Sequence, residues 1–114
     1  MGSRLDINAL YGLQNFRYDL ASPVTAASVL ASMSNGARYV IDTFVISSKV
    51  AGDAILSEQN VSGSAAIGPQ MWFGAQGGAA LDDAYIKLSR NAGLTITTTG
   101  TGSMSIFGLY HLES

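Results

Sequence analysis

Apolar and small polar residues alternate through the last third of the chain, and glycine-containing clusters interrupt the alternation. The alternating runs fall within residues 85–89, 94–99 and 103–112. A period of two gives a strand one buried and one exposed face, so the pattern predicts antiparallel strands. Glycine reaches positive φ at no steric cost. The Gly-Thr-Gly segment at residues 100–102 therefore predicts a hairpin turn between two of these strands.

Strand composition also occurs earlier in the chain. Residues 37–48 hold the densest run of β-branched and aromatic side chains, and both of its faces are largely apolar. This indicates a central strand that is covered on each side. Shorter apolar runs, separated by glycine, asparagine or proline, follow it. Together these segments predict an all-β, antiparallel sandwich or barrel of roughly six to eight short strands, with a turn about every ten residues.

Residues 22–33 admit two interpretations. Ser22 followed by Pro23 fits a helix start, and the alanine content favours a helix. Val24, Thr25 and Val29 instead fit a strand that continues the β pattern. We favour a strand or irregular structure for this segment.

Residues 1–20 have apolar side chains at irregular spacing, and Gly12 and Asn15 interrupt any long helix. The segment is either a strand or loop of the same core, or an extended arm that lies on this domain or on a neighbour. Taking it as an arm divides the chain into an N-terminal arm, residues 1–22, and a β-sandwich domain, residues 23–114. The arm side chains expected at an interface with another chain are Leu10, Tyr11, Phe16 and Tyr18.

The most concentrated apolar cluster is Met71-Trp72-Phe73. Aromatic side chains in strands usually fill the core, and Trp and Phe also dominate the energetics of protein interfaces. Consecutive residues of a strand point to opposite faces, so one strand cannot bury all three on the same side. At least one of the three must face a second layer, which is either another segment of this chain or another subunit. We therefore add all three to the candidate interface residues.

Composition changes the picture of the surface. Of the 114 residues, 47% are hydrophobic and only 12% are charged, whereas charged residues usually make up about a quarter. This shortage suggests that other chains cover much of the surface. The six Lys and Arg residues are scattered, so no basic patch for nucleic acid is visible. No apolar run approaches the roughly 20 residues that span a bilayer, and no secretory signal is evident. Without cysteine, disulfides and thiolate metal sites are excluded, and assembly in the cytoplasm is allowed.

Candidate chemistry is sparse. The adjacent carboxylates of Asp82 and Asp83 suit a solvated turn better than acid/base catalysis, because neighbours on a strand face opposite ways. His111 is the only histidine, too few for a zinc site within one chain, and by alternation it lies with Phe107 and Leu109 at the core edge or an interface. No nucleophile-elbow or phosphate-loop motif occurs. We therefore expect neither an enzyme nor a cofactor or metal site.

The order of these segments resembles a known group of proteins. An N-terminal arm is followed by the strand Arg-Tyr-Val-Ile-Asp-Thr-Phe-Val-Ile-Ser at residues 38–47 and by a Gly/Ala-rich middle. Then come Leu-Ser-Arg-Asn-Ala-Gly-Leu-Thr-Ile-Thr at residues 88–97 and the closing Ser-Met-Ser-Ile-Phe-Gly-Leu-Tyr at residues 103–110. This succession resembles small virion proteins of tailed bacteriophages, in particular head decoration (cement) proteins with a jelly-roll fold. The likeness is one of pattern and composition from residue 38 onward.

The resemblance implies a homotrimeric jelly roll on the capsid surface, where it bridges subunits of the major capsid protein and stabilises the phage head. The arm would reach across the capsid or onto an adjacent subunit, and assembly would take place in the host cytoplasm, without nucleic acid, membrane or cofactor. Jelly rolls also serve in tail tips and receptor-binding proteins. The alternative is therefore a tail-fibre module that recognises host carbohydrate through an exposed aromatic side chain such as Trp72 or Tyr85.

Overall fold

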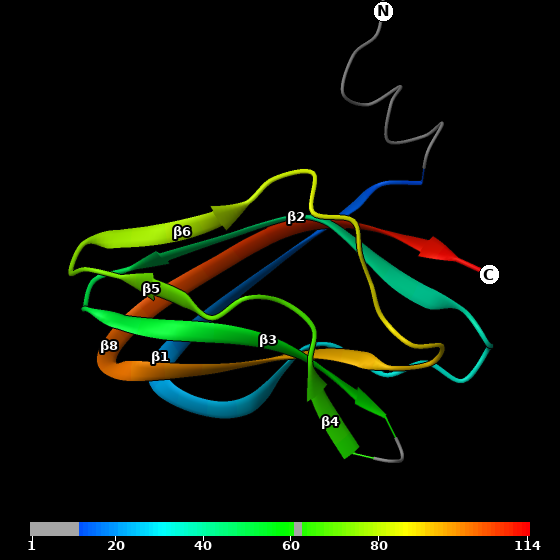
Figure 1. Ribbon diagram of the computed structural model, residues 1–114, viewed down its shortest axis with the longest axis horizontal. Coiled ribbons are helices and arrows are strands. Elements are labelled where there is room, and N and C mark those ends of the chain that lie inside the picture. Colours follow the sequence, from blue (N-terminus) through cyan, green and yellow to red (C-terminus); the bar gives the residue numbers. More distant parts are fainter. Residues whose placement is uncertain (1–11, 61–62) are drawn as a thin grey trace, which may run out of the picture.

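The computed structural model describes residues 12–60 and 63–114, and these fold into eight β-strands without a helix (Figure 1). All pairings between the strands are antiparallel. The strands are β1 (Gln14–Leu30), β2 (Arg38–Ser48), β3 (Gly52–Asn60), β4 (Gly63–Ala66), β5 (Met71–Phe73), β6 (Gly77–Leu81), β7 (Ile86–Lys87) and β8 (Gly93–Glu113). The chain is an antiparallel β-sandwich of the jelly-roll type, which confirms the predicted fold class.

The two longest strands, β1 and β8, run side by side through both layers of the sandwich (Figure 1). The first part of β8 pairs with β3, from Gln59 opposite Gly93 to Ala54 opposite Thr98. Its last part pairs with β2 instead, from Ser48 opposite Met104 to Arg38 opposite Glu113. The first layer therefore consists of β4 and β5, β3, the start of β8 and the end of β1. The second consists of β6 and β7, β2, the end of β8 and the start of β1.

One continuous core lies between the layers. Leu56, Leu94 and Ile96 enter it from the first layer, and they are fully buried. Phe44 and Ile106 enter from the second layer and are equally inaccessible. Burial of an aliphatic or aromatic side chain contributes about 1.5–3 kcal/mol to folding, so these facing rows hold the layers together.

The predicted hairpin at residues 100–102 is wrong, because β8 continues through this segment. Gly100 and Gly102 do have positive φ, 89° and 156°, as the prediction assumed. At this point the strand turns from one layer into the other, and its two halves pair with β3 and β2 instead of with each other as in a hairpin. A Cβ atom on Gly100 would collide with the carbonyl oxygen of Ala51, so glycine also permits a close approach of two backbones there.

The division of the chain at residue 22 is also wrong for the part that the structure describes. β1 begins at Gln14, and its first nine residues pair in unbroken register with residues 102–110 of β8. Phe16 and Leu20 point into the core and are buried. Their spacing has the period of two, which the scattered apolar residues around them obscured. The strand interpretation of residues 22–33 is confirmed as far as Leu30. Residues 1–11 lie outside the described part, so the arm remains a prediction for them.

The predicted central strand at residues 37–48 is β2, which pairs with β8 on one side and with β6 and β7 on the other. Only its first half is covered on both faces, since Tyr39, Val40 and Ile41 are all buried. In its second half the outward side chain of Val45 is exposed. The predicted strand at residues 85–89 is shorter than expected, because only Ile86–Lys87 belong to β7.

Candidate functional site

The seven candidate interface residues do not form one surface. Leu10 and Tyr11 lie outside the described residues. Phe16, Met71 and Phe73 are buried in the core of this chain, so their assignment to an interface is wrong. Tyr18 is half-buried and packs against the core. Trp72 alone among the described candidates is widely exposed, at 73%.

Alternation along β5 explains the different fates of the three consecutive apolar residues. Met71 and Phe73 stand opposite Ala54 and Gly52 of β3 and point into the core. Trp72, opposite Asp53, points the other way. Trp72 thus lies on a different side from the other two, but no described segment of this chain covers it, so the expected second layer stays a prediction for another subunit. An indole exposed in this way is the kind of side chain that anchors protein interfaces.

A second apolar surface lies on the outer face of the second layer. Val45 of β2 stands directly opposite Phe107 of β8, and the two side chains are 37% and 46% exposed. Ala80 of β6 continues the row beyond Val45, and Arg17 of β1 ends it beyond Phe107. We call Val45, Phe107 and Ala80 the outer apolar row. Alternation with the buried Ile46 and Ile106 could have predicted this row from the sequence, but the expected coverage of β2 on both faces concealed it.

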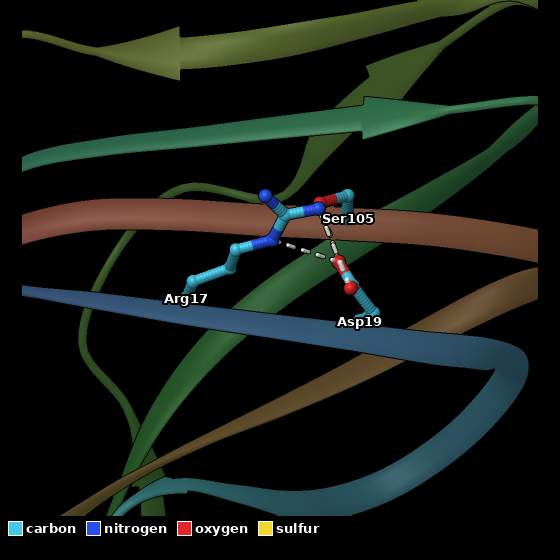
Figure 2. Close-up of polar contacts among 3 residues, drawn as sticks. All are labelled: Arg17, Asp19 and Ser105. Carbon is cyan, nitrogen blue, oxygen red and sulfur yellow. Dashed lines mark hydrogen bonds and ion pairs between the residues drawn. The ribbon is translucent and has the colours of Figure 1, made fainter.

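Beside this row, the charged residues of β1 form a small polar network with β8. Figure 2 shows Arg17 and Asp19 of β1 and Ser105 of β8 pointing toward one another. The Ser105 hydroxyl donates to Asp19 Oδ1 at 2.7 Å, and Arg17 Nε lies 3.4 Å from the same oxygen. The Ser105 hydrogen bond and then the Arg17 hydrogen bond hold the pKa of the Asp19 carboxyl below its ordinary value. Both side chains are exposed, so they are accessible to another molecule in addition to each other.

A third feature is a pocket of about 540 Å³ at the start of β2 and the end of β8, lined among others by Asp42, Thr43, Asp83, Tyr85 and His111. Asp42 is the extra residue of a β-bulge, since Ile41 and Thr43 pair with consecutive residues of β8. The bulge turns the Asp42 carboxylate toward His111, and Asp42 Oδ2 lies 2.8 Å from His111 Nδ1. The Tyr85 ring stands edge-on to the imidazole with centroids 6.4 Å apart, and Tyr85 is 65% exposed.

The described residues around this pocket do not form the catalytic group of a hydrolase. An aspartate that holds one imidazole nitrogen orients the ring, and nucleophilic catalysis also needs a hydroxyl activated by the other nitrogen. The Thr43 hydroxyl of this pocket donates to Asp82 instead, at 3.3 Å. Sequence reasoning missed the pair of Asp42 and His111, because the residues are 69 positions apart and only the bulge brings them together. Asp82 and Asp83 are exposed, as a solvated turn requires.

The buried carboxylate of Asp53 holds segments of the fold together. The Asp53 side chain accepts hydrogen bonds from the Thr99 hydroxyl and the Gln70 amide, in that order of effect, and these lower its pKa. These bonds tie β3 to β8 and to the loop before β5. Residues 12–60 and 63–114 bring together no group of three potential metal ligands. They also contain no helix long and apolar enough to cross a membrane.

No protein-family model and no curated protein sequence matches this chain. Among solved structures, it is similar to a Bacillus endospore appendage protein from disulfide-linked pili, with 15% identity over 87% of this chain and 86% of that chain and a TM-score of 0.50. It is also similar to the nucleoplasmin-like N-terminal domain of Drosophila FKBP39, with 15% identity over 87% and 89% of the two chains and a TM-score of 0.48. The Drosophila NLP core matches with 15% identity over 87% and 99% and a TM-score of 0.48. At 15% identity, the likeness to the appendage protein shows a shared fold alone.

Proposed function

We propose that this chain is a structural protein of a virion, a homotrimeric decoration (cement) protein that binds the capsid of a tailed bacteriophage between subunits of the major capsid protein. It acts through contact surfaces and carries out no reaction. The proposal rests on the jelly-roll fold together with the resemblance of the sequence pattern to such proteins. The observation that carries it is the outer apolar row on a chain with only 12% charged residues.

The outer apolar row suits a flat protein partner. Val45 and Phe107 stand opposite each other on neighbouring strands of the second layer, and both side chains are exposed. Burial of apolar surface contributes roughly 25 cal/mol per Å² before the losses of association are subtracted. Each contact is therefore weak, and three copies of it in a trimer bind far more tightly than one through their high effective concentration. Many such trimers would reinforce a shell against internal pressure.

Co-sedimentation with expanded heads that lack their decoration protein tests this proposal. We expect Phe107→Ser to reduce occupancy at least tenfold, because it removes the largest side chain of the row. Leu112→Ser is the matched control: Leu112 lies on the same strand and is 45% exposed, but its side chain belongs to the opposite face. Equal occupancy by the two variants, or no binding by the unmodified chain, would contradict the proposal.

One observation favours a second candidate function, recognition of a carbohydrate by a tail-fibre module. The pocket beside Tyr85 combines an exposed aromatic ring with the carboxylates of Asp42 and Asp83 and the imidazole of His111. Sugars stack their apolar C–H faces on such rings and donate hydroxyl hydrogens to carboxylates. A glycan array separates the two functions, with Tyr85→Ala as the test and Trp72→Ala, an exposed aromatic outside this pocket, as the control. Binding of a glycan that only the Tyr85 variant loses would favour the second function.

A further inference from the structure

The first half of β1 is an open sheet edge. Among the strands that the structure describes, β1 pairs only with β8, so alternate backbone N–H and C=O groups along its other side have no strand partner. The opposite edges are built from β4, β5, β6 and β7, which have between two and five residues each. Short strands of this kind are a common protection against pairing with another chain.

The two halves of β1 differ in how regularly they pair with β8. Register shifts interrupt the second half after Ser22, after Val24 and after Ser28. The first half, from Gln14 to Ser22, pairs with β8 at nine successive positions without a shift. A regular edge of nine residues can accept a further antiparallel strand along its whole length.

The side chains of this edge are complementary to themselves. Arg17 and Asp19 flank Tyr18 symmetrically and are both exposed on the outer face (Figure 2). When two copies of β1 pair antiparallel about Tyr18, Arg17 of each stands directly opposite Asp19 of the other. Two ion pairs then form, and directly opposed residues of antiparallel strands lie close enough for such contacts. Charges of one sign on an edge would repel a second copy, but this arrangement attracts one.

The inward face agrees with the same register. Phe16 of one copy stands opposite Leu20 of the other, and both belong to the core of their own chain. Tyr18, which is half-buried beside that core, meets its own counterpart. The apolar rows of the two copies thus continue into each other, whereas a shift by one residue would place apolar against polar positions.

We infer that the first half of β1 is a two-fold contact with a second copy of this chain, in which the strands pair antiparallel about Tyr18 and Arg17 of each copy binds Asp19 of the other. The contact closes on itself and joins copies in pairs. It is independent of binding to capsids. A trimer whose copies also make this contact associates further, so a mass above that of a trimer distinguishes the two-fold contact from the trimer contact.

Charge exchange in the full chain tests the contact, with the mass and dissociation constant measured by analytical ultracentrifugation. In a pair of Arg17→Asp chains, the new carboxylate of each chain stands opposite Asp19 of the other. We therefore expect the dissociation constant of the pair to rise about tenfold or more. Asp19→Arg has the same effect through two opposed guanidinium groups. The double variant R17D/D19R restores opposite charges and pairing. Lys87→Asp, which makes the same change of charge on the opposite edge of the sheet, leaves the constant unchanged.

Cysteine cross-linking tests the register itself, and the absence of native cysteine makes each introduced thiol unique. Asn15 and Ala21 are exposed and stand opposite each other in the inferred pairing, so their substitution should not affect folding. A mixture of Asn15→Cys and Ala21→Cys proteins should form a disulfide-linked dimer under mild oxidation, and neither protein should do so alone.

Each outcome of these two experiments either supports the two-fold contact or contradicts it. Cross-linking confined to the mixture, together with rescue by the double charge variant, supports the contact. Equal cross-linking of Asn15→Cys alone, no cross-linking in the mixture, or a double variant as weakened as the single ones would overturn it. If the unmodified chain forms this pair but does not bind capsids, the proposed function is contradicted and the two-fold contact is not.

Discussion

Gly108 offers a direct test of whether the first half of β1 belongs to the sandwich. Gly108 lies on β8 between Phe16 of β1 and Phe44 of β2, its partners in register. A Cβ atom there would collide with Cζ and Cε1 of the Phe16 ring and lie 2.7 Å from the carbonyl oxygen of Thr43. The ring cannot easily move aside, since it also packs against Tyr110 with centroids 6.0 Å apart.

Gly108→Ala therefore overpacks the core. We expect the free energy of unfolding to fall by about 1–3 kcal/mol, the usual range for an added methyl group without room. For a chain of this length the melting temperature should fall by roughly 5–15 °C. Phe16→Leu removes the two atoms that collide and should by itself lower stability by about 0.5–3 kcal/mol. Combined with it, Gly108→Ala should cost less than it does alone, and the cost that remains comes from the carbonyl oxygen of Thr43.

Urea denaturation of the four proteins in this cycle measures the coupling, which we expect to reach about 1–3 kcal/mol. Gly74→Ala is the control, because a Cβ atom there meets no atom within 4 Å and its φ lies outside the left-handed region. Additive effects of the two substitutions, or a Gly108→Ala variant as stable as the unmodified chain, would show that Phe16 does not cover Gly108. The first half of β1 would then not be packed as described.

Two further predictions concern individual side chains. Hydrogen bonds from Thr99 and Gln70 lower the pKa of Asp53, so the stability they contribute is present above the unfolded-state pKa of about 3.9 and is lost as the pH falls through the lower folded-state value. Asp53→Asn should therefore lower stability at neutral pH and flatten its decline in acid, as denaturant titrations across that range will show; an unchanged acid profile would refute this. Trp72→Ala should change stability by less than about 0.5 kcal/mol, because the side chain is exposed. Since Trp72 is the only tryptophan, its emission should shift to shorter wavelength if it is buried on assembly.

The local elements were largely predictable from the sequence, because alternation and β-branched composition act over a few residues. Residues 94–99 and 103–112 are extended as predicted, although they belong to one strand, β8, and the segment predicted at residues 37–48 forms β2 from Arg38. The alternation of Met71, Trp72 and Phe73 also followed from strand geometry alone. These are properties of a pleated backbone and do not depend on which strand lies beside it.

The pairing of strands was not predictable in the same way. Glycine at positions 100 and 102 signals a change of direction. Whether the two halves of β8 then pair with each other or lie in different layers depends on β1. Ser22 of β1 hydrogen-bonds Thr98 and Thr99 at this bend, and it is 76 and 77 positions away from them in the sequence. The pocket beside Tyr85 depends on a single extra residue at Asp42, which leaves the composition of β2 unchanged. Register offsets of one residue redirect side chains without leaving a signal in the pattern.

The most direct measurement is the mass of the purified chain in solution, determined by sedimentation equilibrium from micromolar to millimolar concentration. The proposed decoration protein is a homotrimer, so the structural role requires that copies of the chain associate with one another. We predict a trimer or, with the two-fold contact formed, a larger assembly of trimers. A monomer of 11.9 kDa that persists at millimolar concentration would contradict this role.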